Sequence, residues 1–290
     1  MKKIIIFFLV TLFLGIVFQK NNIVNGQDLV KEVYVKEHIP NKDPVPYPYV
    51  READVMWAKT VWRILDLREK VNFPLYFPTQ PIGNRMSLID VLLYAVENEN
   101  LTAYSATDDL NEFKQIISLA DVNSTLDKGF DTVQVRNLDT QLLDDTVIAR
   151  AAKTDEVKQI MIKEKWFFDR KHSTMQVQIV GMCPIRMYYR DEEIGLEDAT
   201  IQKKKTFWVY YPEVRDVLSS HEIYNRNNDA QRISFDDFFM QRRFSSYIFA
   251  ESNVYNNRSI MNYAPGRESL LESEKIKEYL FNMEHDLWEY

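Results

Sequence analysis

The chain has 290 residues, of which 36 are basic and 43 acidic, so its formal net charge is −7 at pH 7. An acidic surface repels the phosphate backbone, which argues against nucleic acid as a partner. Only seven glycines occur, and because phosphate-binding loops rely on glycine, this scarcity argues against a nucleotide enzyme. Aromatic residues make up 13% of the chain, which is ample for the core of one large domain or two small ones.

The amino terminus has the pattern of a secretory signal peptide. Two lysines precede an apolar run over residues 4–18, which is shorter than the roughly 20 residues that a membrane span needs. We predict that residues 1–26 are removed by cleavage after Gly26, with a single-pass membrane anchor as the alternative. The only cysteine, Cys183, lies far from that site, so it can neither accept a lipid at a new amino terminus nor form an internal disulfide. A buried, hydrophobic position is expected for it.

Residues 27–50 are predicted to form an extended, proline-rich arm. Four of the ten prolines lie between residues 38 and 49, and proline favours polyproline II while removing a backbone donor. On such an arm Val45, Tyr47 and Tyr49 would be exposed apolar surface. The arm either follows the surface of its own chain or lies as a strap on a neighbouring subunit or partner. These three residues are therefore candidate partner-binding residues.

An amphipathic helix is predicted over Arg51–Asn72. Its apolar residues fall at the spacing of one helical face, at Trp57, Val61, Ile64 and Leu65. The helix should end before Phe73, because the residue that precedes a proline avoids the helical region. A short extended piece is expected over residues 75–78.

Two segments share a helix-start pattern followed by a strand. Ser87 with Asp90 precedes a predicted helix over residues 88–98 and a strand over residues 101–105. Ser234 with Asp237 likewise precedes an apolar helix and a strand over residues 246–250.

Upstream of each copy lies a segment that begins with tryptophan, at Trp62 and at Trp208, and ends in an arginine element, at Arg68 and at Arg215. The body, residues 51–264, is thus predicted to hold a weak internal duplication with approximate halves 51–155 and 156–264. The alternative is a chance match, since a capping box is a general helix start.

The clearest strand signal is a hairpin over Lys163–Pro184, with a polar turn at residues 171–173 and apolar residues at alternate positions on both sides. Glu164 interrupts the first strand, which is expected to begin late or to lie at a sheet edge. Two more strands are predicted over residues 186–189 and 203–211. The polar stretch 108–155 is predicted to form loops with a short helix.

A carboxy-terminal helix is predicted within residues 265–290, and its apolar Leu287 and Trp288 are candidate partner-binding residues. The predicted elements together indicate an α+β protein, in which a central antiparallel sheet carries packed helices.

No catalytic, cofactor-binding or metal-binding pattern is recognisable. The four histidines lack any spacing that would place two ligands on one helical turn. Ser220 precedes His221, but chain neighbours do not make a catalytic triad, which is recognised in space. The residues alone leave an exported hydrolase or a periplasmic ligand-binding module as rivals to a structural protein.

Four segments carry a resemblance to a known family. They are Val50–Lys70, Leu101–Tyr104, the hairpin that ends in Gly181–Pro184, and Ser252–Ser259. Together they resemble the gliding-motility GldN/PorN family of the type IX secretion system of Bacteroidetes.

The resemblance implies a periplasmic, non-enzymatic subunit at the inner face of the outer membrane. Such a subunit would self-associate into a ring with a GldK/PorK-like outer-membrane lipoprotein and would contact a GldM/PorM-like motor shaft. It brings no catalytic residues and no cofactor.

Overall fold

The computed structural model describes residues 42–82, 85–107, 112–136, 143–190, 200–225, 228 and 231–286. The predicted signal peptide, most of the predicted arm, and both Leu287 and Trp288 lie outside the described residues.

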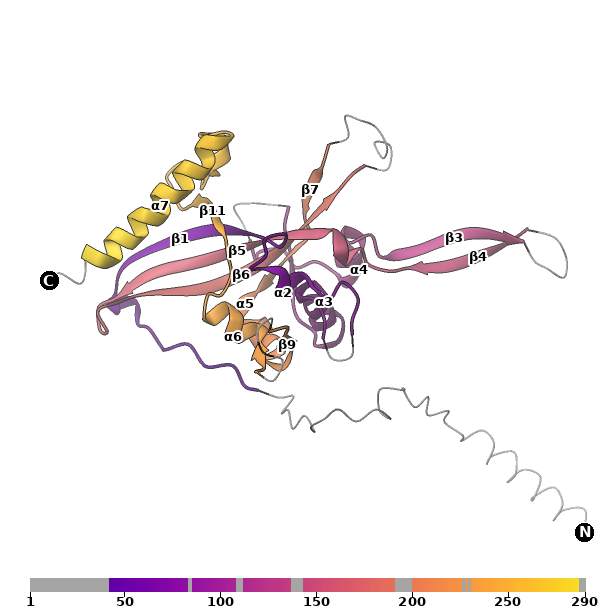
Figure 1. The fold of residues 1–290 in the computed structure, drawn as a ribbon, viewed down its shortest axis with the longest axis horizontal. Coiled ribbons are helices and arrows are strands. Elements are labelled where there is room, and N and C mark those ends of the chain that lie inside the picture. Colours follow the sequence, from indigo (N-terminus) through magenta and orange to yellow (C-terminus); the bar gives the residue numbers. More distant parts are fainter. Residues whose placement is uncertain are drawn as a thin grey trace, which may run out of the picture. The chain divides into compact units, whose positions relative to one another are not determined.

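Eleven strands are described, and most of them belong to one sheet (Figure 1). They are β1 (Val55–Asp66), β2 (Ala103–Ser105), β3 (Gly129–Arg136), β4 (Leu143–Arg150), β5 (Val157–Asp169), β6 (Thr174–Tyr188), β7 (Gln202–Lys205), β8 (Phe207–Tyr210), β9 (Glu222–Ile223), β10 (Ile233–Ser234) and β11 (Tyr247–Glu251).

The α-helices are α2 (Phe73–Tyr76), α3 (Leu88–Asn98), α4 (Leu119–Thr125), α5 (Tyr211–Ser220), α6 (Phe235–Met240) and α7 (Arg267–Asp286). Short 3-10 turns lie at Glu52–Asp54, Thr154–Glu156 and Ile260–Asn262. Within the described parts of the chain, none of the helices is both long enough and apolar enough to cross a membrane.

The main sheet has the strand order β11-β1-β5-β6-β8-β2, with β7 also paired to β6, and its pairs are antiparallel. This confirms the predicted α+β fold with a central antiparallel sheet.

The predicted helix over Arg51–Asn72 is wrong, because most of it forms β1. That strand lies between β11 and β5, and Val61 through Leu65 are all buried. A strand covered on both faces reads as a continuous run and not as an alternation. Such a run contains helix-like spacings by coincidence, whereas its β-branched residues favour a strand. The predicted extended piece at 75–78 is also partly wrong, since α2 includes Leu75 and Tyr76.

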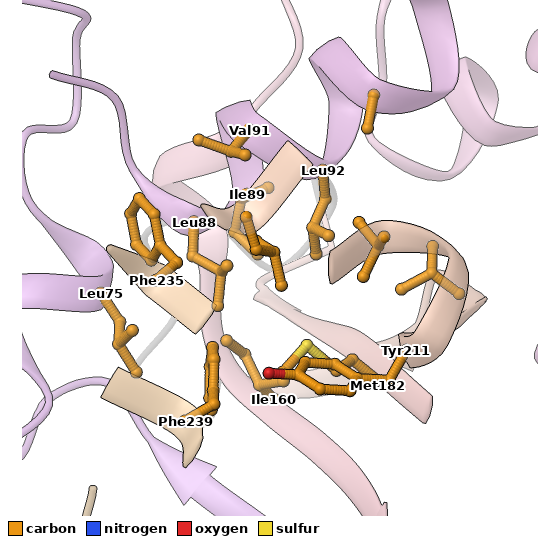
Figure 2. Close-up of a cluster of buried hydrophobic side chains, with 14 of the residues drawn as sticks. Leu75, Leu88, Ile89, Val91, Leu92, Ile160, Met182, Tyr211, Phe235 and Phe239 are labelled. Carbon is orange, nitrogen blue, oxygen red and sulfur yellow. The ribbon is translucent and has the colours of Figure 1, made fainter. Parts of the chain in front are cut away.

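Helices α2, α3, α5 and α6 cover one face of the sheet and form the larger core. Figure 2 shows Leu88, Ile89 and Leu92 of α3 beside Phe235 and Phe239 of α6, with Ile160 of β5 and Met182 of β6 near Tyr211. Burial of each such side chain contributes about 1.5–3 kcal/mol. The helices are therefore fixed to the sheet by one continuous apolar layer.

The opposite face of the sheet carries a second, smaller core that includes Trp62, Trp208 and Cys183. Cys183 is fully buried, as predicted. Phe113 packs into this face directly over Gly181. A Cβ at position 181 would lie 2.3 Å from the Phe113 ring and 2.9 Å from the Val209 carbonyl oxygen. Glycine is therefore required there to admit the ring.

Both predicted serine-capped helices are confirmed. The Ser87 hydroxyl oxygen accepts a hydrogen bond from the Asp90 amide at 3.2 Å at the start of α3. Ser234 accepts one from the Asp237 amide at 3.0 Å, and the Asp237 carboxylate completes a capping box at α6. Strands β2 and β11 follow these helices, as predicted.

The central hairpin is confirmed as β5 and β6, joined by a turn in which Ser173 has a φ of 51°. The prediction that Glu164 marks a late strand start or a sheet edge is wrong. This residue lies within β5, which pairs with β1 on one side and β6 on the other. The strand predicted over residues 186–189 is mostly the end of β6, and the one over residues 203–211 divides into β7 and β8.

The stretch 108–155 contains the predicted short helix, α4, but residues 129–136 and 143–150 are not loops. They form the two-stranded sheet of β3 and β4, which pair with each other from Gly129 opposite Arg150 to Arg136 opposite Leu143. The described side chains on these strands include exposed Phe130, Val147 and Ile148. One-sided burial, which gives the alternating pattern on which strand prediction depends, is therefore not seen among them.

Candidate interaction sites

The described part of the arm, residues 42–50, lies against α5 and α6 of its own chain. The Lys42 ammonium lies 2.5 Å from the Asp237 carboxylate. The Ser219 hydroxyl donates to the Lys42 carbonyl oxygen at 2.5 Å. These contacts fix the start of the described arm to two helices.

A buried ion pair lies beneath the arm. Arg215 binds Asp236 through two hydrogen bonds, at 2.9 Å and 3.0 Å, and donates a third to the Val45 carbonyl oxygen at 2.6 Å. The Tyr211 hydroxyl also donates to Asp236, at 2.9 Å. Burial, followed by the nearby Asp236 carboxylate, raises the pKa of Tyr211. The phenol therefore stays protonated and keeps its role as donor.

Tyr47 stacks on this pair, with its ring 4.4 Å from the Arg215 guanidinium, and it packs against the larger core. Burial raises the pKa of Tyr47, partly offset by Arg215. In contrast, Val45 is 65% exposed and Tyr49 is 89% exposed. The structure thus places one of the three arm candidates on its own chain, and the role of Val45 and Tyr49 in partner binding stays a prediction.

A second buried charge cluster, which the sequence interpretation missed, centres on Glu164. This side chain is 0% exposed. It accepts hydrogen bonds from Arg63 at 2.9 Å, from Arg242 at 2.8 Å and from the Trp166 indole at 3.0 Å. The cluster joins β5 to β1 and to the α6–β11 connection. The sequence did contain one signal for this cluster, namely an acidic residue within an apolar strand. A buried carboxylate requires hydrogen-bond donors or a positive charge beside it.

A cleft of about 740 Å³ lies next to this cluster, between the sheet and α7. The Arg63 and Arg242 guanidinium groups lie 5.7 Å and 5.6 Å from the Trp166 ring in its wall. On the opposite wall α7 contributes Glu274 and Phe281. The cleft thus combines aromatic surface with charges of both signs, which is the composition of a protein interface.

Helix α7 confirms the predicted terminal helix, and it packs on its own chain. It buries Ser273, Ile276 and Leu280, and the Ser273 hydroxyl accepts a hydrogen bond from the Ile248 amide of β11 at 2.9 Å. This contact covers part of the sheet edge. Four large apolar or aromatic side chains of the helix remain exposed, namely Leu270, Leu271, Tyr279 and Phe281.

The Ser252–Ser259 segment forms a tight loop after β11. The Asn253 amide group donates to the Glu251 and Arg258 carbonyl oxygens at 3.1 Å and 3.2 Å. The Arg258 guanidinium lies 4.4 Å from the Tyr255 ring. Val254 at the tip is 89% exposed. This fixed loop therefore presents an apolar side chain to solvent.

The β3–β4 hairpin exposes Phe130 and Val147, at 77% and 64%. Its base is held by ion pairs, because Asp127 contacts Arg150 and Lys153, both at 2.8 Å. The hydrogen bond from Lys153 lowers the pKa of Asp127. The hairpin is thus anchored at one end, while Phe130 and Val147 face solvent.

His172 and His221 each contact a group of their own chain. His221 and Ser220 both lie at the end of α5, where the His221 Nδ1 is 2.8 Å from the Val217 carbonyl oxygen and Ser220 donates to the same oxygen at 2.8 Å. His172 pairs with Asp169 at 2.5 Å in the β5–β6 turn. Among the described residues, no group of three or more histidine, cysteine or acidic side chains could hold a metal ion.

Residues 50–289 match the family model described as gliding motility associated protein GldN. A search of the curated proteins gave no match. The matched segment contains every strand and helix from β1 to α7, including the cleft, the 252–259 loop and the β3–β4 hairpin. The chain therefore belongs to the GldN family of gliding motility associated proteins.

Proposed function

We propose that this chain is a non-enzymatic adaptor of the type IX secretion and gliding motility machinery. In this role it is exported to the periplasm and lies at the inner face of the outer membrane. Many copies form a ring with a GldK/PorK-like lipoprotein, and the ring contacts a GldM/PorM-like motor shaft. Membership of the GldN family, as a component of gliding motility and secretion, is the single observation that carries the proposal.

The distribution of exposed apolar residues supports an adaptor. Both faces of the sheet are covered by cores, so the body has the character of a scaffold. Apolar side chains are exposed instead on separate outer elements, namely Val147 of the hairpin, Val254 of the loop, and Leu271 and Phe281 of α7. Exposed apolar patches on a folded protein mark interaction sites.

The buried ion pairs also suit a component that transmits force. Glu164 connects two strands and a connection far apart in the sequence, and Arg215 connects α5, α6 and the arm. Networks of this kind fix one arrangement of the elements. A load applied at the α6–β11 connection would thus reach β1 and β5 through a stiff connection.

Co-expression of the full chain with the outer-membrane lipoprotein of the same machinery tests the proposal. We expect the two to co-purify as a large complex by size-exclusion chromatography with light scattering. A chain that stays monomeric beside every candidate partner from the machinery would overturn the adaptor role.

A matched pair of variants locates the contact. Phe281→Glu on α7 should reduce co-purification at least tenfold, because a charge would enter an apolar interface. Met56→Glu, which changes an equally exposed side chain on β1, should leave it unchanged. Equal effects from both variants would argue against a contact at α7.

A further inference from the structure

We propose that the loop Ser252–Ser259 docks an acidic segment of a partner protein, whose carboxylate binds the Arg258 guanidinium. The inference deepens the proposed function, since it rests on the adaptor role and assigns the chemistry of one partner contact. None of the described side chains of this loop belongs to a hydrophobic core. Packing of the fold therefore does not explain them.

Arg258 is held between two tyrosine rings. Its guanidinium carbon lies 4.4 Å from the centre of the Tyr255 ring and 4.9 Å from that of Tyr263. Stacking uses the flat faces of a guanidinium and leaves the N–H donors at its edge available. Among the residues that the structure describes, none accepts a hydrogen bond from these donors and no acidic side chain forms an ion pair with them. The guanidinium is thus fixed in position while its donors are available to another molecule.

A second stacked arginine of the chain shows which group such donors bind. Arg215 lies 4.4 Å from the Tyr47 ring, and it binds the Asp236 carboxylate through two hydrogen bonds, at 2.9 Å and 3.0 Å. Two parallel hydrogen bonds are the strongest contact between a guanidinium and a carboxylate. The Arg258 donors, which are stacked in the same way, are therefore suited to a carboxylate from a partner.

The loop holds this arrangement before any partner binds. The Asn253 amide donates to the Asn257 side-chain oxygen at 3.1 Å, and the Tyr255 amide donates to the Asn253 side-chain oxygen at 3.0 Å. Asn256 and Asn257 have left-handed backbone angles, with φ of 55° and 53°, which asparagine adopts more readily than most residues. A site that is ordered in advance loses less entropy on binding.

Apolar and aromatic side chains surround the charge. Val254 is 89% exposed, Tyr255 is 62% exposed and Met261 is 57% exposed. Arginine and tyrosine are the residues that most often dominate the binding energy of an interface. A small anion would leave this apolar surface uncovered. The observations therefore favour a protein segment that places an apolar residue beside its carboxylate.

A pocket of about 470 Å³ adjoins the guanidinium. Its lining includes Arg258 and Asn257 of the loop, and Phe249 of β11. Glu112 also lines this pocket, but it accepts a hydrogen bond from Lys163 at 2.6 Å, so its charge is balanced. Amide and guanidinium groups supply donors. The pocket thus suits an acidic side chain with an apolar neighbour.

Arginine side-chain NMR on the full chain tests the carboxylate directly. The probe is the acetylated and amidated peptide Gly-Leu-Glu-Leu-Gly, and the same peptide with glutamine in place of glutamate is its control. The Nε–H signal of Arg258, identified by its loss in R258K, should shift with the glutamate peptide, which should bind at least tenfold more tightly than the control. The signal of Arg85, which stacks on the single ring of Tyr224 at 5.4 Å, should not move.

The same titration separates an acidic segment from a free anion. A shift with inorganic phosphate but not with the glutamate peptide would show a simple anion site and would overturn the proposal. Equal shifts with the glutamate and glutamine peptides would also overturn it, because the carboxylate would then play no part.

Assembly gives an independent result. With the lipoprotein and the motor shaft protein co-expressed, R258A should reduce co-purification of one of these partners at least tenfold. R258K should reduce it as well, because lysine keeps the charge but neither stacks nor binds at two points in the same way. R85A is the matched control and should leave both partners bound. Circular dichroism and melting temperatures check that every variant folds.

Photocross-linking identifies the partner segment. A photoreactive benzoylphenylalanine at the exposed position of Val254 should cross-link to a segment that contains an aspartate or a glutamate. Changing that acid to its amide should weaken assembly as much as R258A does, and the two changes together should weaken it no further. A segment without an acid, or losses that simply add, would contradict the docking site.

The outcomes separate this inference from the adaptor role. If R258A assembles as well as the parent chain, the docking site is rejected and the adaptor role stands. If the parent chain itself fails to co-purify with either partner, the adaptor role is rejected, and the peptide titration decides by itself whether Arg258 binds a carboxylate.

Discussion

The two halves of the body use similar elements, but they treat their arginines differently. Trp62 of β1 and Trp208 of β8 lie in strands on either side of the central hairpin, and both are buried in the smaller core. After Trp62 comes Arg68, which is exposed and pairs with Asp66 at 2.5 Å. After Trp208 comes Arg215, which is buried and pairs with Asp236. The Arg68–Asp66 pair of the first half therefore lies at the surface, whereas Arg215 of the second half holds the arm.

The strand order suggests how the two halves are combined. Strand β2, which follows α3, pairs with β8, whereas β11, which follows α6, pairs with β1. Each half thus contributes the strand that follows its serine-capped helix to a strand of the other half. An internal duplication with exchanged strands would produce this order around β5 and β6, and the duplication stays a prediction.

Loss of the Glu164 charge should lower the free energy of unfolding most, because this residue joins both halves. Glu164→Gln leaves the buried Arg63 without its carboxylate, and breaking a buried pair costs about 3–5 kcal/mol. Urea unfolding should show this loss. Glu251→Gln, which breaks the partly exposed pair with Lys59, is the control and should cost below about 1 kcal/mol. Equal losses would mean that the cluster adds no more than a surface pair.

Asp236→Asn should give the next largest loss in the free energy of unfolding. It should also weaken the attachment of the arm to α5 and α6. Loss of the charge leaves Arg215 buried and partly unpaired, which we expect to cost about 3 kcal/mol. Limited proteolysis should then cleave near residues 42–50 faster than in the parent chain. Unchanged cleavage in a destabilised variant would show that the arm is held without this pair.

Removal of a helix N-cap should lower the free energy of unfolding by similar, smaller amounts in the two halves. Ser87→Ala and Ser234→Ala each remove an N-cap, and such a loss typically costs about 1 kcal/mol. Ser234→Ala should cost the larger amount, because it also breaks a complete capping box. Thermal unfolding of both variants tests the order, and a larger loss for Ser87→Ala would reverse it.

The surface pair of the first half should have the smallest effect, visible only at acid pH. The hydrogen bond from Arg68 lowers the pKa of Asp66 to about 2, below the value near 4 of an unfolded chain. The contribution of the Arg68–Asp66 pair to the free energy of unfolding is therefore present above about pH 4 and is lost as the pH falls to about 2. Solvent screening keeps this contribution below about 1 kcal/mol. Asp66→Asn should flatten the pH dependence of stability in this window, and an unchanged slope would argue against the pair.

Sequence patterns predicted the elements that have one buried face or a clear start signal. The β5–β6 hairpin, the caps at Ser87 and Ser234, and the helix α7 are confirmed. The prediction failed for β1, where burial on both faces removes the alternation. It also failed for β3 and β4, where the described residues 147–150 are exposed on both faces. Periodicity is informative only when the two faces of a strand differ.

The interaction sites were predictable in part. The arm was recognisable from its prolines, but the docking of Tyr47 on Arg215 depends on residues 168 positions apart in the chain. The cluster of Glu164, Arg63 and Arg242 also joins distant segments. A single sequence carries no direct signal for such pairings, and only the unexplained acid in an apolar strand pointed to one.

Gly181 has a consequence for the order of folding. The Phe113 ring lies over Gly181 of β6 and beside the rings of Trp208 and Tyr210 on the neighbouring β8. This site is complete only after these strands have paired, so we expect the Phe113 ring to dock after the main folding barrier. Phe113→Leu should therefore speed unfolding while leaving the folding rate nearly unchanged. Stopped-flow measurements with both limbs of the chevron would show it, and slower folding would place the docking earlier. On this expectation Phe113 packs last, and its contact with β6 and β8 limits the rate at which the sheet unfolds.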